Sequence, residues 1–147
     1  MVVLSSHFMQ AILPLITAAT KPLAAPYCGL FTNNVIPTYN TVLAGLTEAV
    51  YTGYAEQAVT FETVYGKPDG SIVLQTTLLE FAGPTDTTGQ ICYGYFILDA
   101  ITSGNLLMAE LFAVPINLSV PPSAAVFSAQ LALRPTNNNG QYTQVAP

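Results

Sequence analysis

One histidine and eight acidic residues are the side chains of this chain that could support acid–base chemistry. His7 stands beside Ser5 and Ser6, but a catalytic serine needs a base that a third group orients, and adjacency in sequence does not supply that arrangement. We therefore expect His7 at a helix start or on the surface. Glu56 and Glu62 share the parity of one predicted strand. Six residues of strand would separate them by about 20 Å, which is too far for the two facing carboxylates of a glycosidase.

Metal and phosphate sites are also not indicated by the sequence. Asp86 and Asp99 lie in or beside predicted loops, but the spacing of a calcium-binding loop is missing. Cys28 and Cys92 lie far apart without a Cys-x-x-Cys pair, and no Gly-rich phosphate loop occurs. We expect both cysteines to be reduced, with a single disulfide between them as the alternative. The sequence thus predicts no catalytic residue, no metal and no cofactor, and the chain is expected not to be an enzyme.

The scarcity of charge is the most unusual bulk property of the chain. Only 7% of residues are charged and the net charge is −5, whereas a soluble domain typically carries roughly 25% charged residues. The basic residues are Lys21, Lys67 and Arg134. Three scattered cations cannot form the basic patch that nucleic acid requires, and they disfavour docking on anionic membranes. We expect part of the surface to be covered by a partner or by copies of the chain; the alternative is a monomer with a surface of Thr, Asn, Gln and Ser.

Hydrophobic periodicity predicts a mostly β chain of one domain, over residues 26–134. The expected strands cover residues 27–32, 59–65, 72–81, 91–98, 106–112, 116–120 and 127–133, with turn residues between them. Residues 91–98 are apolar at successive positions, which is typical of a central strand covered on both faces. Short strands separated by turns favour an antiparallel β-sandwich or a jelly-roll-like fold.

Two segments with almost no charge flank this domain; Lys21 is the one charged residue in them. Residues 1–25 are predicted to form a helix over residues 5–20, which Pro14 should kink, or an irregular apolar arm. Residues 135–147 are predicted to be an extended tail. No Lys or Arg precedes the apolar run, so a secretory signal is not expected, and the run is too short to span a bilayer. Because neither end has a derivable role in the core, both are candidate interfaces. The candidate residues are Phe8, Met9, Ile12, Leu15, Ile16, Tyr142 and Val145.

Exposed tyrosines would support a different class of function. Tyr51, Tyr54, Tyr93 and Tyr95 are candidates for stacking on sugars in a carbohydrate-binding sandwich. The competing interpretation is that they pack in the core with the hydroxyl group at its edge.

Three short sequence motifs occur in order along the predicted β domain. The first is Leu30-Phe31-Thr32-Asn33-Asn34-Val35-Ile36-Pro37-Thr38, which matches a Leu-aromatic-Thr-Asn-Asn-x-x-Pro pattern. The second is Thr47-Glu48-Ala49-Val50-Tyr51-Thr52-Gly53-Tyr54-Ala55. The third combines Tyr93-Gly94-Tyr95 with Ala109-Glu110-Leu111-Phe112. In their order and rough spacing over residues 27–133, these motifs resemble a family of short proteins from tailed-phage and environmental viral genomes. The family's N-terminal helix is charged, whereas residues 1–20 here carry no charge.

This resemblance implies a virion structural protein. The expected role is decoration or cement on the capsid exterior, assembled in the host cytoplasm, with the major capsid protein and copies of the chain itself, as a dimer or trimer, as partners. A tail or baseplate component is the alternative that the resemblance leaves open. No nucleic acid and no membrane are expected as partners.

Overall fold

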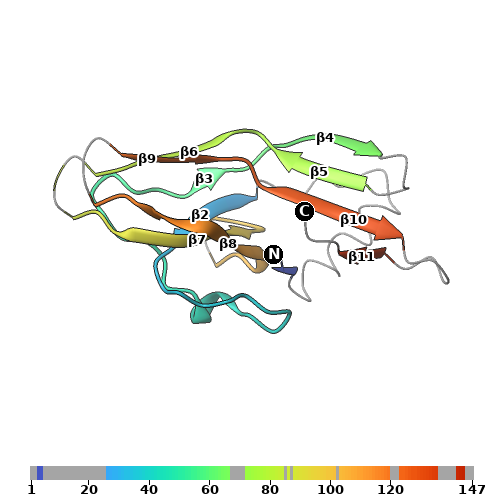
Figure 1. Ribbon diagram of the computed structural model, residues 1–147, viewed down its shortest axis with the longest axis horizontal. Helices are drawn as coiled ribbons and strands as arrows, with labels where there is room; N and C mark the ends of the chain where they lie inside the picture. Colours follow the sequence, from blue (N-terminus) through green and yellow to red (C-terminus); the bar gives the residue numbers. More distant parts are fainter. Residues whose placement is uncertain are drawn as a thin grey trace.

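The computed structural model describes residues 3–4, 26–66, 72–84, 86, 88–101, 103–119, 123–135 and 142–144. In these residues the regular structure is antiparallel β, apart from one 3-10 turn, η1 (Leu43–Gly45). The prediction of a mostly β, antiparallel chain is therefore confirmed. Figure 1 shows two layers of strands, with a loop below them and a group of strands that extends to one side.

The first layer is a five-stranded sheet with strand order β1-β8-β7-β2-β3. Every neighbouring pair in it is antiparallel. Its strands are β1 (Val3–Leu4), β8 (Leu106–Asn117), β7 (Ile91–Leu98), β2 (Tyr27–Phe31) and β3 (Gln57–Ala58). The central strand β7 is buried from Gly94 to Leu98. This sheet positions both hydrophobic cores of the protein, one on each of its faces.

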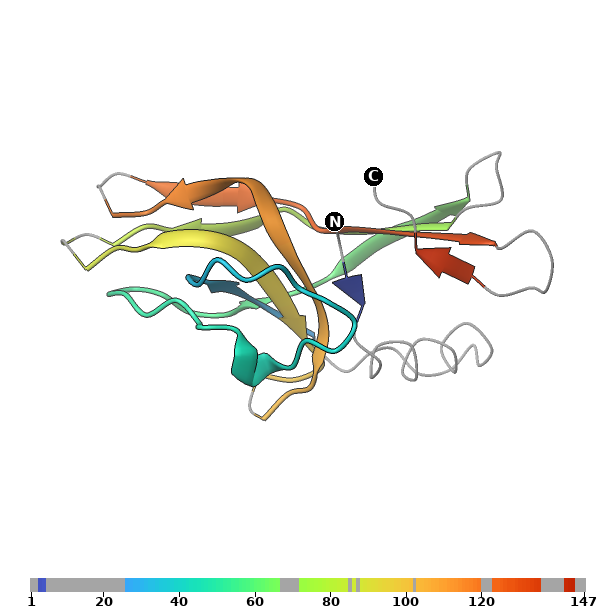
Figure 2. The ribbon, with the colours of Figure 1, turned by 60° about the horizontal axis from the view of Figure 1, so that its bottom comes forward.

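The second layer is a long ribbon. It contains β6 (Leu79–Ala82) paired with β9 (Ala124–Phe127), and it continues into a four-stranded sheet, β11-β10-β5-β4, made of β11 (Tyr142–Gln144), β10 (Gln130–Pro135), β5 (Ile72–Thr76) and β4 (Phe61–Gly66). β5 leads into β6 and β9 leads into β10, and Thr76 N–H donates to Ala129 O across the junction at 3.0 Å. Figure 2 shows β4, β5 and β10 extending beyond the five-stranded sheet.

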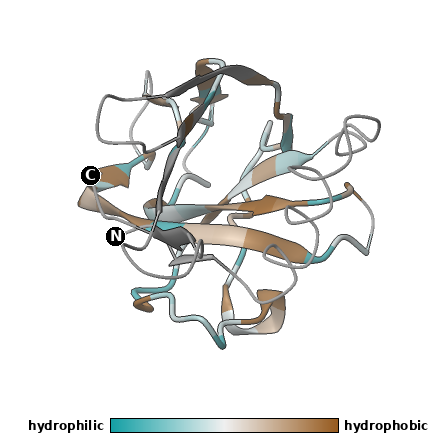
Figure 3. Ribbon diagram, turned by 90° about the vertical axis from the view of Figure 1, so that its right-hand side faces the viewer, coloured by the Kyte–Doolittle hydropathy of each residue, from teal (hydrophilic) through white to brown (hydrophobic). Residues whose placement is uncertain are grey.

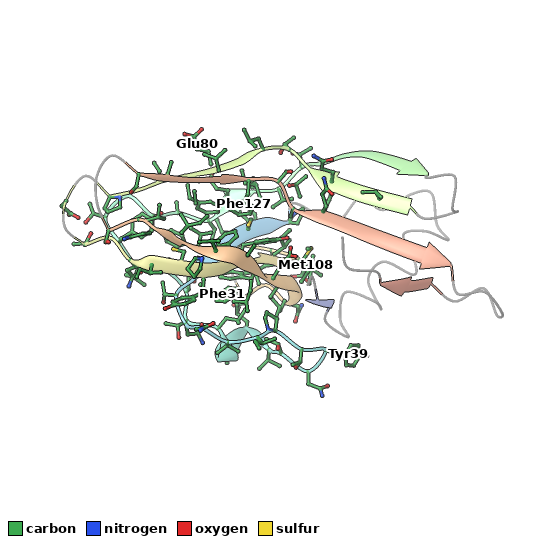
Figure 4. The ribbon with its side chains drawn as sticks, in the orientation of Figure 1. Phe31, Tyr39, Glu80, Met108 and Phe127 are labelled. Carbon is green, nitrogen blue, oxygen red and sulfur yellow. The ribbon has the colours of Figure 1, made fainter. Side chains whose placement is uncertain are left out.

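The main core lies between the two layers. Leu30, Ile97 and Leu107 of the five-stranded sheet belong to it together with Leu79 and Phe81 of the ribbon, and all five are nearly inaccessible to solvent. Phe127 of β9, which is labelled in Figure 4, packs against this core. Burial of such side chains contributes about 1.5–3 kcal/mol each, so this core is the main source of stability for the fold.

A second core covers the opposite face of the five-stranded sheet. Phe31, Phe96 and Leu98 form it with Leu106 and Ala109, and Leu46 of the following loop packs on top. Adjacent residues of β7 thus enter different cores, with Ile97 in the first and Phe96 in the second. This confirms that residues 91–98 form a central strand covered on both faces. In Figure 3 hydrophobic residues dominate the strands that cross the middle of the view.

Several sequence expectations differ from the observed elements. Residues 72–81 form two strands, β5 and β6. Gln75 pairs with Gln130 and Leu79 pairs with Phe127, so the β5–β6 side has one more residue between these pairs than the β9–β10 side, and the pairing is interrupted there. β8 runs on to Asn117, so 116–120 is not a separate strand. Residues 142–144, expected in an extended tail, form β11 against β10.

The terminal predictions fall mostly outside the described residues. The expected helix over 5–20 lies there, and with it Phe8, Met9, Ile12, Leu15 and Ile16. The described part of the N-terminal segment, Val3–Leu4, is strand β1 on the outer edge of β8 rather than helix. Val145 is also outside the described residues, and Tyr142 lies in β11, where it pairs with Pro135.

Candidate functional site

A closed loop between β2 and the segment that returns along it is the most distinctive surface feature. We call residues 32–47 the pinned loop. Its ends meet where Thr32 N–H donates to Thr47 O at 2.8 Å. The Asn33 side chain closes it further: Nδ2 donates to Gly45 O at 2.9 Å, and Oδ1 accepts from Thr47 N–H at 2.8 Å. Such a compact loop with adjoining ends is an Ω-loop, a class that is frequently functional.

Further hydrogen bonds fix the shape of the pinned loop. Thr38 N–H donates to Thr41 Oγ1 at 2.7 Å, and Thr41 N–H returns a bond to Thr38 O at 2.9 Å. Pro37 is buried, and Leu43 and Leu46 pack on the second core. One side of the loop is therefore anchored in the fold, and its backbone is held before any partner arrives.

The other side of the pinned loop presents apolar side chains to solvent. Ile36 is 70% exposed, Tyr39 58% and Val42 63%. The loop contains no charged residue. Figure 4 places Tyr39 at the far end of the loop, away from the two strand layers. The pinned loop thus combines an internally bonded backbone with large apolar side chains exposed to solvent and no charge.

Tyr54 fastens the segment after the loop to β2. Ala49 N–H donates to Leu30 O at 2.9 Å, and Leu30 N–H donates to the Tyr54 hydroxyl at 3.0 Å. The Tyr54 hydroxyl in turn donates to Glu48 Oε1 at 3.0 Å. It therefore satisfies a β2 amide that β3 does not reach. Burial raises the pKa of Tyr54, and it also raises the pKa of Glu56, with repulsion from Glu48 as the second cause.

The four candidate sugar-stacking tyrosines do not form an exposed row. Tyr51 is buried and donates to Ala82 O at 3.0 Å, and burial raises its pKa to about 12. Tyr95 is buried too, and it donates to Glu110 Oε2 at 2.6 Å. Tyr54 and Tyr93 are partly buried and pack against the two cores. Tyr51 and Tyr95 therefore follow the competing interpretation: each ring packs in the core, and its hydroxyl group forms a hydrogen bond at the edge of the core.

The acidic candidates lie in separate turns. Asp86 Oδ1 accepts from the backbone and the hydroxyl of Thr88, and these bonds lower the Asp86 pKa. The Asp99 carboxylate accepts from the backbone and side chain of Asn105, in the turn between β7 and β8. In both cases the hydrogen bonds of the carboxylate close the turn in which the aspartate lies. Among the described residues, no group of three or more His, Cys, Asp or Glu is placed to hold a metal ion.

The two cysteines are free and buried, in agreement with the expectation of reduced thiols. Burial raises the pKa of Cys92 to about 11, and it raises that of Cys28 further. Neither thiol is a reactive nucleophile in the folded chain. In the part of the chain that the structure describes, no helix is long and apolar enough to cross a membrane.

Sequence reasoning missed the pinned loop as a site. The sequence analysis placed the candidate interfaces at the two ends of the chain. The available signal was the long uncharged stretch of residues 22–47. Comparison of the chain with protein-family models, with curated proteins and with solved structures found no match.

Proposed function

We propose that this chain is a structural protein of a tailed-phage virion, a decoration or cement protein that binds the major capsid protein shell and stabilises it without catalysis. The observation that carries the proposal is the exposure of large hydrophobic side chains on a nearly uncharged protein. Within the described residues these are Val35, Ile36, Tyr39, Val42, Val50, Leu78, Ile91, Ile101, Val114 and Val126.

Such a surface fits a protein that works inside an assembly. A dispersed monomer keeps its surface charged and its apolar patches small, because exposed apolar area drives association. With 7% charged residues, this chain has little of that protection. In a shell, those of these side chains that face a neighbouring protein are covered, and each Å² of apolar area removed from water contributes about 25 cal/mol. Repetition over many copies adds avidity.

The arrangement of the strands supports a scaffold role. Two antiparallel layers with the main core between them support assignment to the β-sandwich class, with jelly-roll-like connections as the finer proposal. The resemblance to phage proteins rests in part on residues 30–38, and in this chain those residues form the end of β2 and the start of the pinned loop. That part of the pattern thus encodes a surface element that a structural protein could use.

The proposal is tested on particles. The tailed phage that encodes the chain would be grown with and without it, and purified capsids from the deficient phage would be mixed with the purified protein and sedimented. We expect saturable binding at a fixed copy number per capsid, a higher capsid melting temperature, and extra density on the shell exterior in an image reconstruction. Density confined to the tail or baseplate would replace decoration by the alternative structural role. Absence from the particle would refute the virion assignment.

Self-association belongs to the same proposal. We expect a dimer or trimer, and sedimentation equilibrium of the isolated protein measures it. Glycan binding is not proposed, because Tyr51 and Tyr95, two of the four tyrosines that would have formed the stacking row, are buried.

A further inference from the structure

We propose that the pinned loop is the docking element of this protein, and that it inserts Ile36, Tyr39 and Val42 into an apolar pocket of a protein partner with a basic rim. The inference deepens the proposed virion role and rests on it, since the partner is the shell protein. It assigns the contact to a single loop rather than to the chain ends.

The shape of the loop is the first argument. Docking through a mobile segment costs free energy, because side chains and backbone must be ordered on binding. Here Asn33 bonds to both Gly45 and Thr47, and Thr38 and Thr41 bond each other inside the loop. The loop is therefore ordered before it binds, and its apolar contacts are not offset by ordering.

The position of the apolar side chains is the second argument. The loop already uses Leu43 and Leu46 to cover the second core. Ile36, Tyr39 and Val42 do not contribute to either core and are more than half exposed. These three side chains on one bonded loop are of the types that supply the central, desolvated part of an interface, where aromatic residues such as Tyr39 are enriched.

Charge decides the chemistry of the partner. The loop carries no charge, Glu48 is exposed directly after it, and the whole chain carries −5. An anionic bilayer would repel such a chain, and a bilayer offers no defined pocket for a rigid loop. An apolar pocket bordered by Lys or Arg is complementary to this region: the pocket accepts the uncharged loop, and its basic rim faces Glu48.

The test uses two matched triple variants of the full chain. The loop variant carries Ile36→Thr, Tyr39→Thr and Val42→Thr. The control variant carries Leu78→Thr, Val114→Thr and Val126→Thr, which are equally exposed but lie outside the loop. Circular dichroism and thermal melting establish that both fold. Each is then titrated onto purified capsids that lack the protein.

We expect the loop variant to bind capsids roughly 100-fold more weakly than the unmodified chain, and the control variant to bind within about threefold of it. Glu48→Gln should slow association several-fold at low salt and have no effect at high salt. Undiminished capsid binding by the loop variant would overturn the docking assignment and leave the virion role intact. Failure of the unmodified chain to bind would overturn both.

A lipid partner is the competing outcome. The unmodified chain and the loop variant are sedimented with vesicles of phosphatidylcholine and phosphatidylglycerol. We expect neither to bind. Vesicle binding by the unmodified chain that the loop variant loses would show a membrane-inserting loop and would overturn the protein pocket.

Discussion

Replacing Asn33 by alanine should open the pinned loop while the strand layers stay folded. The side chain makes two hydrogen bonds across the neck of the loop, to Gly45 O at 2.9 Å and from Thr47 N–H at 2.8 Å. No backbone bond duplicates these two contacts; the neighbouring closure is the Thr32–Thr47 backbone bond. The change therefore removes two hydrogen bonds that close the neck of the loop, leaves the Thr32–Thr47 backbone bond, and removes no side chain of either hydrophobic core.

The magnitude follows from the number and exposure of the bonds. A typical protein hydrogen bond contributes about 0.5–1.5 kcal/mol net. Water can replace part of both bonds of Asn33, because Thr47 and Gly45 are exposed. We expect the Asn33→Ala change to lower the free energy of unfolding by about 1–2 kcal/mol, which corresponds to a melting temperature lower by roughly 3–6 °C.

Amide hydrogen exchange separates local opening from global destabilisation. In the unmodified chain the Thr47 amide is held by Asn33 Oδ1, and in the variant it has lost that acceptor. Its exchange should accelerate at least tenfold more than that of the Ala49 amide, which bonds Leu30 O and changes only as much as global stability does. The matched control is Asn34→Ala, at the exposed neighbouring position, with an expected change within about 0.5 kcal/mol. Equal effects of the two substitutions on the Thr47 amide would refute the pinning role of Asn33.

Three further outcomes follow from particular side chains. Burial raises the pKa of Glu56, so protonated Glu56 stabilises the folded state at low pH, and this contribution is lost as the pH rises through the folded pKa. Glu56→Gln should therefore raise the free energy of unfolding at pH 7 and flatten its pH dependence in urea titrations. A steeper pH dependence in the variant would contradict the assignment. Gly94→Ala should destabilise the fold severely or prevent folding, because an added Cβ would lie 2.1 Å from a carbonyl oxygen of β8, whereas Gly45→Ala, with open space around it, should be nearly neutral in the same denaturation assay. Cys28 and Cys92 should react with a thiol reagent only after unfolding, since both are buried with raised pKa values; rapid labelling of the native chain would show that the main core opens.

Much of the strand pattern was accessible from the sequence. The pattern of apolar and polar residues is a local property, and it located β2 and β4 to within a few residues. The single strand expected over residues 127–133 is instead the end of β9 and most of β10, with residues 128–129 between them. The unbroken apolar run of β7 correctly indicated a strand with a core on each face.

Irregularities of the ladders were not accessible. Cys92 pairs with Ile116 and Gly94 with Leu111, so β8 has three extra residues in a bulge that includes Val114 and Pro115. A bulge depends on the partner strand and on the core beneath it, which no local window contains. The same holds for the extra residue between β5 and β6.

The sequence by itself determined that this is a mostly β chain with little charge, because composition and period-two alternation are properties of neighbouring residues. Only the tertiary structure decided how residues 32–47 close into the pinned loop. Asn33 meets Gly45 and Thr47 twelve and fourteen residues away, and Tyr54 meets Leu30 across twenty-four. Contacts of that separation form only when the strands have packed, since each needs a backbone partner that the core holds in place.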